Sequence, residues 1–220
     1  VVIGKDTRIS GYMLESALES GFSSAGVDVL LTGPIPTPAI AFLTKSLGAQ
    51  IGVVISASHT SFEDNGIKFF TKDGQKFSSD LEKRIELKIT QPIQTVKSVN
   101  LGMASRISNA QEQYIEFCKS ITPNLDLTDL SILLDCANGA TYSVAPRIFE
   151  SLGATVETIS AEPDGININQ NCGSTNPDSL VRAMSNGKYD LGIAFDGDGD
   201  RILIVGKSGK VLDGDDLLYL

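Results

Sequence analysis

The sequence predicts an α/β protein composed of two duplicated three-layer α/β/α domains, each with a mostly parallel mixed sheet. Short apolar runs alternate with segments of helical spacing, which is typical of this fold class. The same order of elements also occurs twice: a helix ends at Gly26 or Gly153, a strand follows, a Thr-Pro or Asn-Pro pair opens a helix, and a buried strand comes next. We predict a first domain over residues 1–103, a second over residues 104–210 and the start of a third over residues 211–220 of a longer protein.

In the first half, four strands are predicted at residues 1–3, 27–31, 51–55 and 67–70. Leu14, Leu18, Phe22 and Ala25 recur at helical spacing before the glycine stop. A second helix begins at Thr37-Pro38, with proline at its first position, and a third spans residues 78–89. The uninterrupted apolar run at residues 51–55 is typical of a strand covered on both faces. Residues 90–104 are polar and predict a linker.

The second half is predicted to begin with a helix from about Ala104 to Ile121. Strands are expected at residues 132–134, 156–159, 191–195 and 202–205, with helices ending at Gly153 and near Gly187. A turn that enters a helix is expected over residues 213–220. The strand at 191–195 corresponds to the strand at 51–55, so the loops that follow these two strands should occupy equivalent ends of their sheets, where ligands bind in open α/β folds.

Composition excludes several classes of partner. The 220 residues include 18 basic and 27 acidic side chains, a net charge of −9, which argues against nucleic acid or an anionic membrane as a general partner. Cys118, Cys136 and Cys172 lack zinc-site spacing and are odd in number, so we expect reduced thiols in a cytoplasmic protein. We expect neither a signal peptide nor a membrane span, because no apolar run approaches about 18 residues.

The loop after residue 195 has the composition of a metal site. Asp196, Asp198 and Asp200 alternate with glycines and precede Arg201. Glycines between the acids allow the backbone to curl so that three carboxylates face one point, which suits a hard cation such as Mg²⁺ or Ca²⁺. Three like charges in one turn repel one another without such a cation.

Four alternatives apply to this loop. An EF-hand is excluded, because Arg201 and Lys207 stand where glycine and glutamate are required. A phosphatase that uses Asp196 as an aspartyl nucleophile stays open, as does a non-enzymatic Mg²⁺- or Ca²⁺-binding module. A solvated turn is the remaining structural explanation.

The loop after residue 55 places Ser58 beside His59, the only histidine, with Lys68 close behind. A serine hydroxyl can carry a phosphoryl group where a base removes its proton and cations neutralise the charge. Lys68, Arg201 and Arg8 are the candidate cations. Neither a Gly-x-Ser-x-Gly nucleophile elbow surrounds Ser58 nor a P-loop ends at Ser208.

Four ordered motifs together resemble the α-D-phosphohexomutase family. They are Gly4-Lys-Asp-Thr-Arg-Ile-Ser-Gly-Tyr-Met13, Ile55-Ser-Ala-Ser-His59 with Asp64-Asn-Gly-Ile-Lys-Phe-Phe70, Pro163-Asp-Gly-Ile-Asn-Ile-Asn169 with Cys172-Gly-Ser-Thr175, and Asp196-Gly-Asp-Gly-Asp-Arg201. The third motif favours members that act on glucosamine phosphate over those that act on mannose or glucose phosphate, which remain the alternative.

The resemblance implies a phosphoserine enzyme. It implies that Ser58 carries the phosphate and that His59 is a candidate base. It implies that Arg201 and Lys68 contact the phosphoryl group. It also implies that Mg²⁺ is held by an oxygen of phosphorylated Ser58 together with Asp196, Asp198 and Asp200. The implied reaction interconverts glucosamine 6-phosphate and glucosamine 1-phosphate through a hexosamine bisphosphate. The resemblance further implies a place in cell-wall precursor synthesis and a homodimer of the full-length protein.

The sequence departs from the family in two ways. Thr60-Ser61 replaces the usual Asn-Pro after the histidine, which removes a rigid proline from the catalytic loop. The family has four domains, of which this chain covers two. We therefore expect the chain to fold but to be inactive alone.

Overall fold

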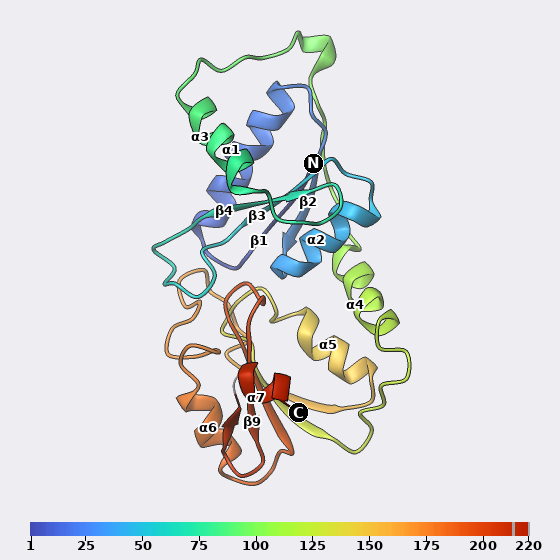
Figure 1. The fold of residues 1–220 in the computed structure, drawn as a ribbon, viewed down its shortest axis with the longest axis vertical. Coiled ribbons are helices and arrows are strands. Elements are labelled where there is room, and N and C mark those ends of the chain that lie inside the picture. Colours follow the sequence, from blue (N-terminus) through green and yellow to red (C-terminus); the bar gives the residue numbers. More distant parts are fainter. Residues whose placement is uncertain (213, 220) are drawn as a thin grey trace.

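The computed structural model describes residues 1–212 and 214–219, which form two domains stacked along the long axis of the molecule (Figure 1). The first domain contains a five-stranded sheet of order β4-β3-β1-β2-β5. Its strands are β1 (Val2–Lys5), β2 (Val29–Pro34), β3 (Ile51–Ile55), β4 (Ile67–Thr71) and β5 (Ala104–Arg106). The second domain contains a five-stranded sheet of order β10-β9-β8-β6-β7. Its strands are β6 (Ser131–Asp135), β7 (Thr155–Ile159), β8 (Leu191–Phe195), β9 (Ile202–Gly206) and β10 (Val211–Leu212).

The two sheets repeat one topology. Strands β4-β3-β1-β2 have the same order as β9-β8-β6-β7, and in each set only the first pair is antiparallel. Strand β3 pairs along its whole length with antiparallel β4, beginning with Ile55 opposite Ile67. Strand β8 pairs in the same way with β9, beginning with Phe195 opposite Ile202. Strands β3 and β8 thus occupy equivalent places in the repeated order, and the third residue after β3 is Ser58 while the third after β8 is Asp198. This repetition confirms the duplicated fold.

Helices cover both faces of each sheet. They are α1 (Ser10–Ser24), α2 (Thr37–Ser46), α3 (Ser79–Ile89), α4 (Ala110–Ser120), α5 (Val144–Ser151), α6 (Asp178–Met184) and α7 (Gly214–Tyr219), with a short 3₁₀ turn at Ser98–Asn100. In the first domain, α2 packs Ile40 and Leu43 on one face of the sheet, while α1 contributes Leu18 and Phe22 to the other. The second domain is arranged likewise, with α5 on one face and α6 on the other. Each domain is thus a three-layer α/β/α unit.

Helices α1 and α5 end just before glycines, as predicted. Gly26 and Gly153 have φ of 81° and 101°, a conformation that glycine adopts without steric cost. Helix α2 begins at Thr37 with Pro38 in its first turn, also as predicted. None of the helices within residues 1–212 and 214–219 combines the length and the apolar character needed to cross a membrane.

The predicted helix start at Ala104 is wrong. Residues 104–106 form β5, which pairs in parallel with β2, and α4 begins only at Ala110. The exposed sequence Ala-Ser-Arg has no apolar alternation, so its pairing depends on the neighbouring strand. A domain boundary near residue 107 fits this pairing better than the predicted boundary at residue 103, and we propose it instead.

The end of the chain was predicted to form a turn and a helix over residues 213–220. Helix α7 spans Gly214–Tyr219, while Asp213 and Leu220 lie outside the described residues. Residues 211 and 212 form β10 and extend the second sheet. The start of a third domain at residues 211–220 remains a proposal.

Close packing at the centre of the first sheet gives a testable expectation for Gly52 in β3. A Cβ atom there would overlap Thr44 Oγ1 and lie 3.2 Å from Ile40 Cγ2 and 3.3 Å from Phe70 Cβ. We expect Gly52→Ala to lower the free energy of unfolding by about 1–3 kcal/mol in urea titrations, because helix α2 must move outward. Gly21→Ala, which places a methyl group in open space on α1, is the control and should not destabilise the protein. Equal unfolding midpoints for the two variants would contradict this expectation.

Candidate active site

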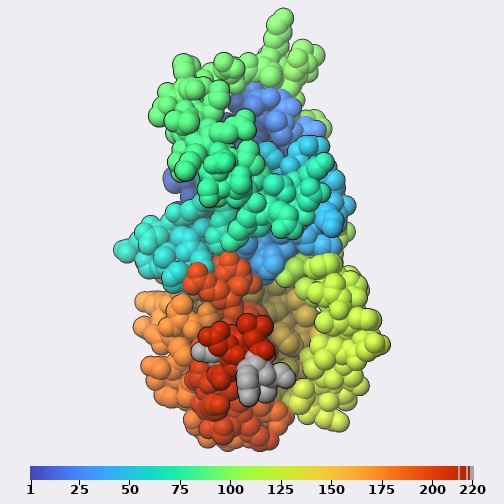
Figure 2. All heavy atoms as spheres, viewed as in Figure 1, coloured from blue at the N-terminus to red at the C-terminus, as the bar shows by residue number. Residues whose placement is uncertain are grey.

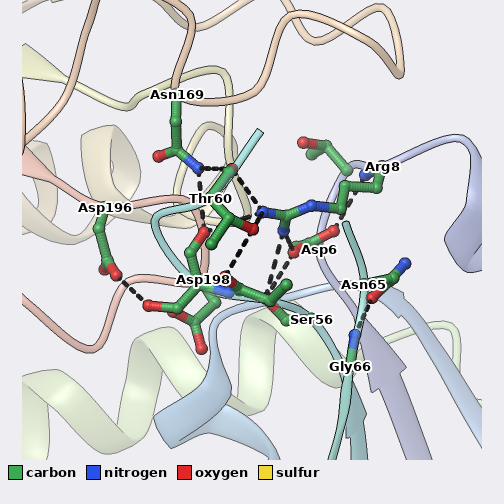
Figure 3. A network of polar contacts seen from close by, with 12 residues as sticks. Asp6, Arg8, Ser56, Thr60, Asn65, Gly66, Asn169, Asp196 and Asp198 are labelled. Atoms are coloured by element: carbon green, nitrogen blue, oxygen red, sulfur yellow. Dashed lines mark hydrogen bonds and ion pairs between the residues drawn. The ribbon is translucent and has the colours of Figure 1, made fainter. Parts of the chain in front are cut away.

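The loops that follow β3 and β8 meet where the two domains touch. Ser58 Oγ, from the first domain, donates a hydrogen bond of 2.6 Å to Asp196 Oδ2, from the second. Figure 2 shows the first domain seated directly on the second, without a gap between them in this view. Figure 3 shows Asp196 and Asp198 close to the first-domain loop. The two loops, which the sequence places at equivalent ends of their sheets, therefore meet in the structure.

Ser58 is held in an uncommon backbone conformation. Its φ is 53°, in the left-handed region that non-glycine residues adopt rarely and at an energetic cost. The Ser58 N–H donates to Ser56 Oγ at 2.9 Å, and the Ser56 hydroxyl in turn donates to buried Asp6. This network turns the Ser58 side chain out of the first domain and toward the second.

The three acidic side chains fit a cation. Ligand oxygens of Asp196, Asp198 and Asp200 all lie within 4.8 Å of one another. Asp198 Oδ1 is buried and has no hydrogen-bond partner among residues 1–212 and 214–219, which is costly unless something else satisfies it. A hard divalent cation, which takes carboxylate oxygens as ligands, would satisfy this atom. The donor set and the unsatisfied oxygen therefore suit the ion that the sequence predicts.

Lys68 neutralises part of the acidic cluster. Its ammonium group donates to Asp198 Oδ2 at 2.6 Å and lies 3.5 Å from Asp200 Oδ2. The Lys68 side chain is 24% exposed and therefore remains partly open to solvent. It can therefore contact an anionic group that approaches Ser58 while it stays paired with the acids.

The acids differ in proton affinity. Burial, together with the charges of Asp198 and Asp200, raises the pKa of Asp196, although the hydrogen bond from Ser58 opposes this. Burial also raises the pKa of Asp198, but hydrogen bonds from Lys68 and Thr37 outweigh it and leave the pKa below its usual value. For Lys68, burial lowers the pKa, and the hydrogen bond and charge of Asp198 reverse this into a net increase. Asp196 thus binds a proton more readily than Asp198 does.

The remaining predicted residues occupy different surroundings. His59 is exposed, directly beside Ser58. Arg201 is also exposed, and its Nε lies 3.8 Å from Asp200 Oδ1. Arg8 is fully buried and paired with Asp6, and its guanidinium donates to backbone carbonyls of the Ser58 loop. The structure therefore brings Ser58, Lys68 and the three acids together, places His59 and Arg201 at the rim, and places Arg8 behind the loop.

Two functional side chains were missed by sequence reasoning. The Thr37 hydroxyl donates to Asp198 Oδ2, and the Thr37 N–H donates to Asp198 O at 2.9 Å. The Asn169 amide donates to two carbonyls of the Ser58 loop. Thr37 was interpreted only as a helix start and Asn169 only as part of a motif, although their shared position at strand-exit loops could have indicated the site.

Comparison with known protein families gives independent evidence for the family of this chain. The family described as "Phosphoglucomutase/phosphomannomutase, alpha/beta/alpha domain I" matches residues 1–95, and the corresponding "alpha/beta/alpha domain II" matches residues 112–209. Together the two matches cover most of the chain, including both loops of the site. They confirm the resemblance that the four sequence motifs indicate.

Relatives and solved structures agree with this match. The chain is 57% identical over its whole length to proteins named phosphoglucosamine mutase from Legionella pneumophila (strain Corby) and Pseudomonas entomophila (strain L48), of which it covers 49% and 50%. A phosphoglucomutase/phosphomannomutase family protein from Burkholderia thailandensis superposes with a TM-score of 0.81 at 28% identity, covering 96% of this chain and 47% of that one. The chain thus spans about half the length of these relatives. It belongs to the phosphoglucomutase/phosphomannomutase family, of which it contains the alpha/beta/alpha domains I and II.

Proposed function

We propose that the protein containing this chain interconverts glucosamine 6-phosphate and glucosamine 1-phosphate by passing a phosphoryl group through Ser58. The observation that carries the proposal is the 2.6 Å contact between Ser58 Oγ and Asp196 Oδ2 across the domain interface, beside Lys68 and the acidic cluster. The relatives at 57% identity are named phosphoglucosamine mutases, which supports glucosamine over mannose or glucose as the sugar.

Asp196, Asp198 and Asp200 would hold Mg²⁺ together with an oxygen of phosphorylated Ser58. When bound, the ion would neutralise charge on the phosphoryl oxygens. The unsatisfied Asp198 Oδ1 and the alternating glycines support this assignment. Phosphoserine adds about −1.5 to −2 charge at neutral pH, so the phosphorylated protein should bind Mg²⁺ more tightly than the unphosphorylated one.

The residues divide the chemistry between them. Ser58 Oγ forms a bond to phosphorus of the bisphosphate as the bond from phosphorus to the sugar oxygen breaks, and that oxygen takes up a proton. Lys68 and Arg201 stabilise the negative charge of the transferred group. The Ser58 proton points to Asp196 Oδ2 in this structure, while exposed His59 is the base that the family resemblance implies, and we propose both as proton acceptors.

The position of the phosphate tests this proposal against the aspartyl-nucleophile phosphatase. The intact protein that contains this chain is incubated with glucosamine 1,6-bisphosphate, digested and mapped by mass spectrometry. Acid-stable phosphate on Ser58 is expected. Acid-labile, hydroxylamine-sensitive phosphate on Asp196 would overturn the mutase in favour of the phosphatase, and Mg²⁺ binding without any phosphate uptake would favour a simple ion-binding module.

Mg²⁺ affinity should depend on pH through Asp196. Because the pKa of Asp196 is raised, its proton competes with the ion, and affinity should increase as pH rises from about 4 toward neutrality. The free energy of unfolding without metal depends on pH in the opposite direction. The fold favours protonated Asp196, so the stabilisation from this proton is present below about pH 4 and is lost as pH rises through the raised pKa. Calorimetric titration with Mg²⁺ at several pH values tests the first point. An affinity that is constant with pH would contradict it.

Further properties follow from the same proposal. We expect the 220-residue chain to fold and bind Mg²⁺ but not to turn over hexosamine phosphate, because it spans about half of its relatives and remote binding groups orient the reacting end of a substrate. Buried Cys136 and Cys172, which are free thiols, support a cytoplasmic location. A role in peptidoglycan precursor synthesis and a homodimer of the full-length protein complete the proposal.

A further inference from the structure

The left-handed turn at Ser58 directs two backbone carbonyls toward the domain interface. These are the carbonyls of Ser58 and Thr60, which flank His59. Residues 60 and 61 of this loop are threonine and serine, so no proline ring restricts the backbone φ here. Hydrogen bonds within the loop, from Ser58 N–H to Ser56 Oγ and from the Thr60 hydroxyl to Ala57 O, are supplemented by contacts from outside it.

Two side chains bind these same carbonyls from opposite sides. From the first domain, Arg8 Nη2 donates to Ser58 O at 3.1 Å and to Thr60 O at 2.7 Å. From the second domain, Asn169 Nδ2 donates to Ser58 O at 2.9 Å and to Thr60 O at 3.0 Å. Figure 3 shows Thr60 between the Arg8 guanidinium and the Asn169 amide. The loop is thus held between one donor of its own domain and one donor of the other.

The Asn169 side chain is itself rigidly placed. Its φ is 58°, which asparagine tolerates better than most residues, and its N–H donates to Ala137 O at 2.8 Å. Asn169 Oδ1 is buried, and no group in the described part of the chain donates a hydrogen bond to it. Rotating the amide by a half turn would direct this oxygen at two carbonyl oxygens, so only the observed orientation makes hydrogen bonds.

The contact also reaches the acidic loop. A Cβ atom on Gly197, between Asp196 and Asp198, would lie 2.6 Å from Ser58 O and 2.7 Å from Asn169 Nδ2. Any side chain at residue 197 would therefore force the serine loop and Asn169 away from the acids. The interdomain contact therefore depends on the close approach of three loops, which contain Ser58, Asn169 and Gly197, and Asn169 supplies the hydrogen-bond donor.

We propose that Asn169 is a positioning residue for phosphoryl transfer. It acts through the Ser58 loop and sets the direction of Ser58 Oγ relative to the three acids of the second domain. This inference rests on the proposed function, because it concerns the same reaction. The Asn169 amide donates its hydrogen bonds to the carbonyls of Ser58 and Thr60, and not to the acids or to Ser58 Oγ. Its effect should therefore fall on the rate of transfer and not on metal binding.

The test compares two asparagine variants in the intact protein that contains this chain. Asn169→Gly removes the amide but keeps the left-handed backbone accessible. Asn171→Gly is the matched control, because Asn171 has φ of 54°, is exposed, and makes no side-chain hydrogen bond with the described part of the chain. We expect Asn169→Gly to lower kcat by about 10- to 100-fold, with KM within about twofold, because small misplacement of a reacting group has effects of this size. The control should retain kcat.

Two further readouts separate positioning from general damage. Amide hydrogen exchange of residues 57–61 should accelerate in Asn169→Gly but not in the control, while Mg²⁺ affinity of the unphosphorylated protein stays within about twofold. Asn169→Asp, which keeps the shape but directs an acceptor at two carbonyl oxygens, should lower kcat at least as much as the glycine variant. Equal kcat for Asn169→Gly and Asn171→Gly would overturn the inference. So would a loss of Mg²⁺ affinity and thermal stability that matches the loss of rate. A wild-type protein that never carries phosphate on Ser58 would instead overturn the proposed function, and the inference with it.

Discussion

Replacing Ser58 with alanine is expected to reduce mutase activity of the intact protein by at least about 10⁴-fold, because the variant lacks the oxygen that forms the covalent intermediate. The substitution removes one buried hydroxyl, and with it the 2.6 Å hydrogen bond to Asp196. The left-handed backbone at this residue is supported by bonds to the main chain, so the loop should keep its place. Steady-state kinetics with glucosamine 1-phosphate and a trace of the bisphosphate give the comparison.

Ser61→Ala is the control for this experiment, since Ser61 is an exposed serine of the same loop. Its activity should stay close to that of the wild type. Mass spectrometry should find phosphate on the control and none on Ser58→Ala. Substantial turnover by Ser58→Ala would show that another group carries the phosphate, and Asp196 would be the first candidate.

The second large effect concerns the metal. Asp198→Asn should weaken Mg²⁺ binding by more than about 100-fold, since even partners that only orient a ligand contribute about 10- to 100-fold to metal affinity or activity. Asp198 is buried, is kept ionised by Lys68 and Thr37, and has the unsatisfied oxygen that points to an ion. An amide cannot supply the same charge to a hard cation.

Asp178→Asn is the matched change at an exposed acid of the same domain and should leave Mg²⁺ affinity unchanged. Isothermal titration calorimetry on the 220-residue chain is sufficient, because the acidic cluster lies within it. If Asp198→Asn bound Mg²⁺ as tightly as Asp178→Asn, the ion would have to be held elsewhere. Circular dichroism of both variants checks that the fold is retained.

Local patterns predicted most of the fold and the identity of the two site loops. Glycine stops, proline helix starts and apolar strand runs each depend on residues that are near one another in the sequence, so the strands at 51–55 and 191–195 were placed correctly. The carboxylate cluster was predicted for the same reason, since its three acids lie within five residues. The correspondence of the two strands then predicted that the loop after each strand lies at the equivalent end of its own sheet.

Contacts between distant residues could not be predicted in this way. The pairing of β5 with β2 joins segments about 75 residues apart, and nothing in Ala-Ser-Arg marks it as a strand. Arg8 was predicted to contact phosphate, and this stays a prediction, but burial beside Asp6 and hydrogen bonds to the Ser58 loop direct its charge inward. Asn169 reaches a loop more than 100 residues away, and only the three-dimensional arrangement shows which carbonyls it binds.

Ser58 and Asp198 are each the third residue after the equivalent strands β3 and β8, and this has a consequence for the origin of the site. An ancestral single unit that paired with a copy of itself would have placed two identical loops face to face across a twofold axis. After fusion into one chain, the two copies could diverge, one toward a hydroxyl that accepts a phosphoryl group and the other toward a carboxylate that binds a cation. Such a division of labour cannot be reversed by exchanging the halves, because each now lacks the chemistry of the other. In the present structure the two equivalent positions carry different groups, a hydroxyl on the first domain and a carboxylate on the second.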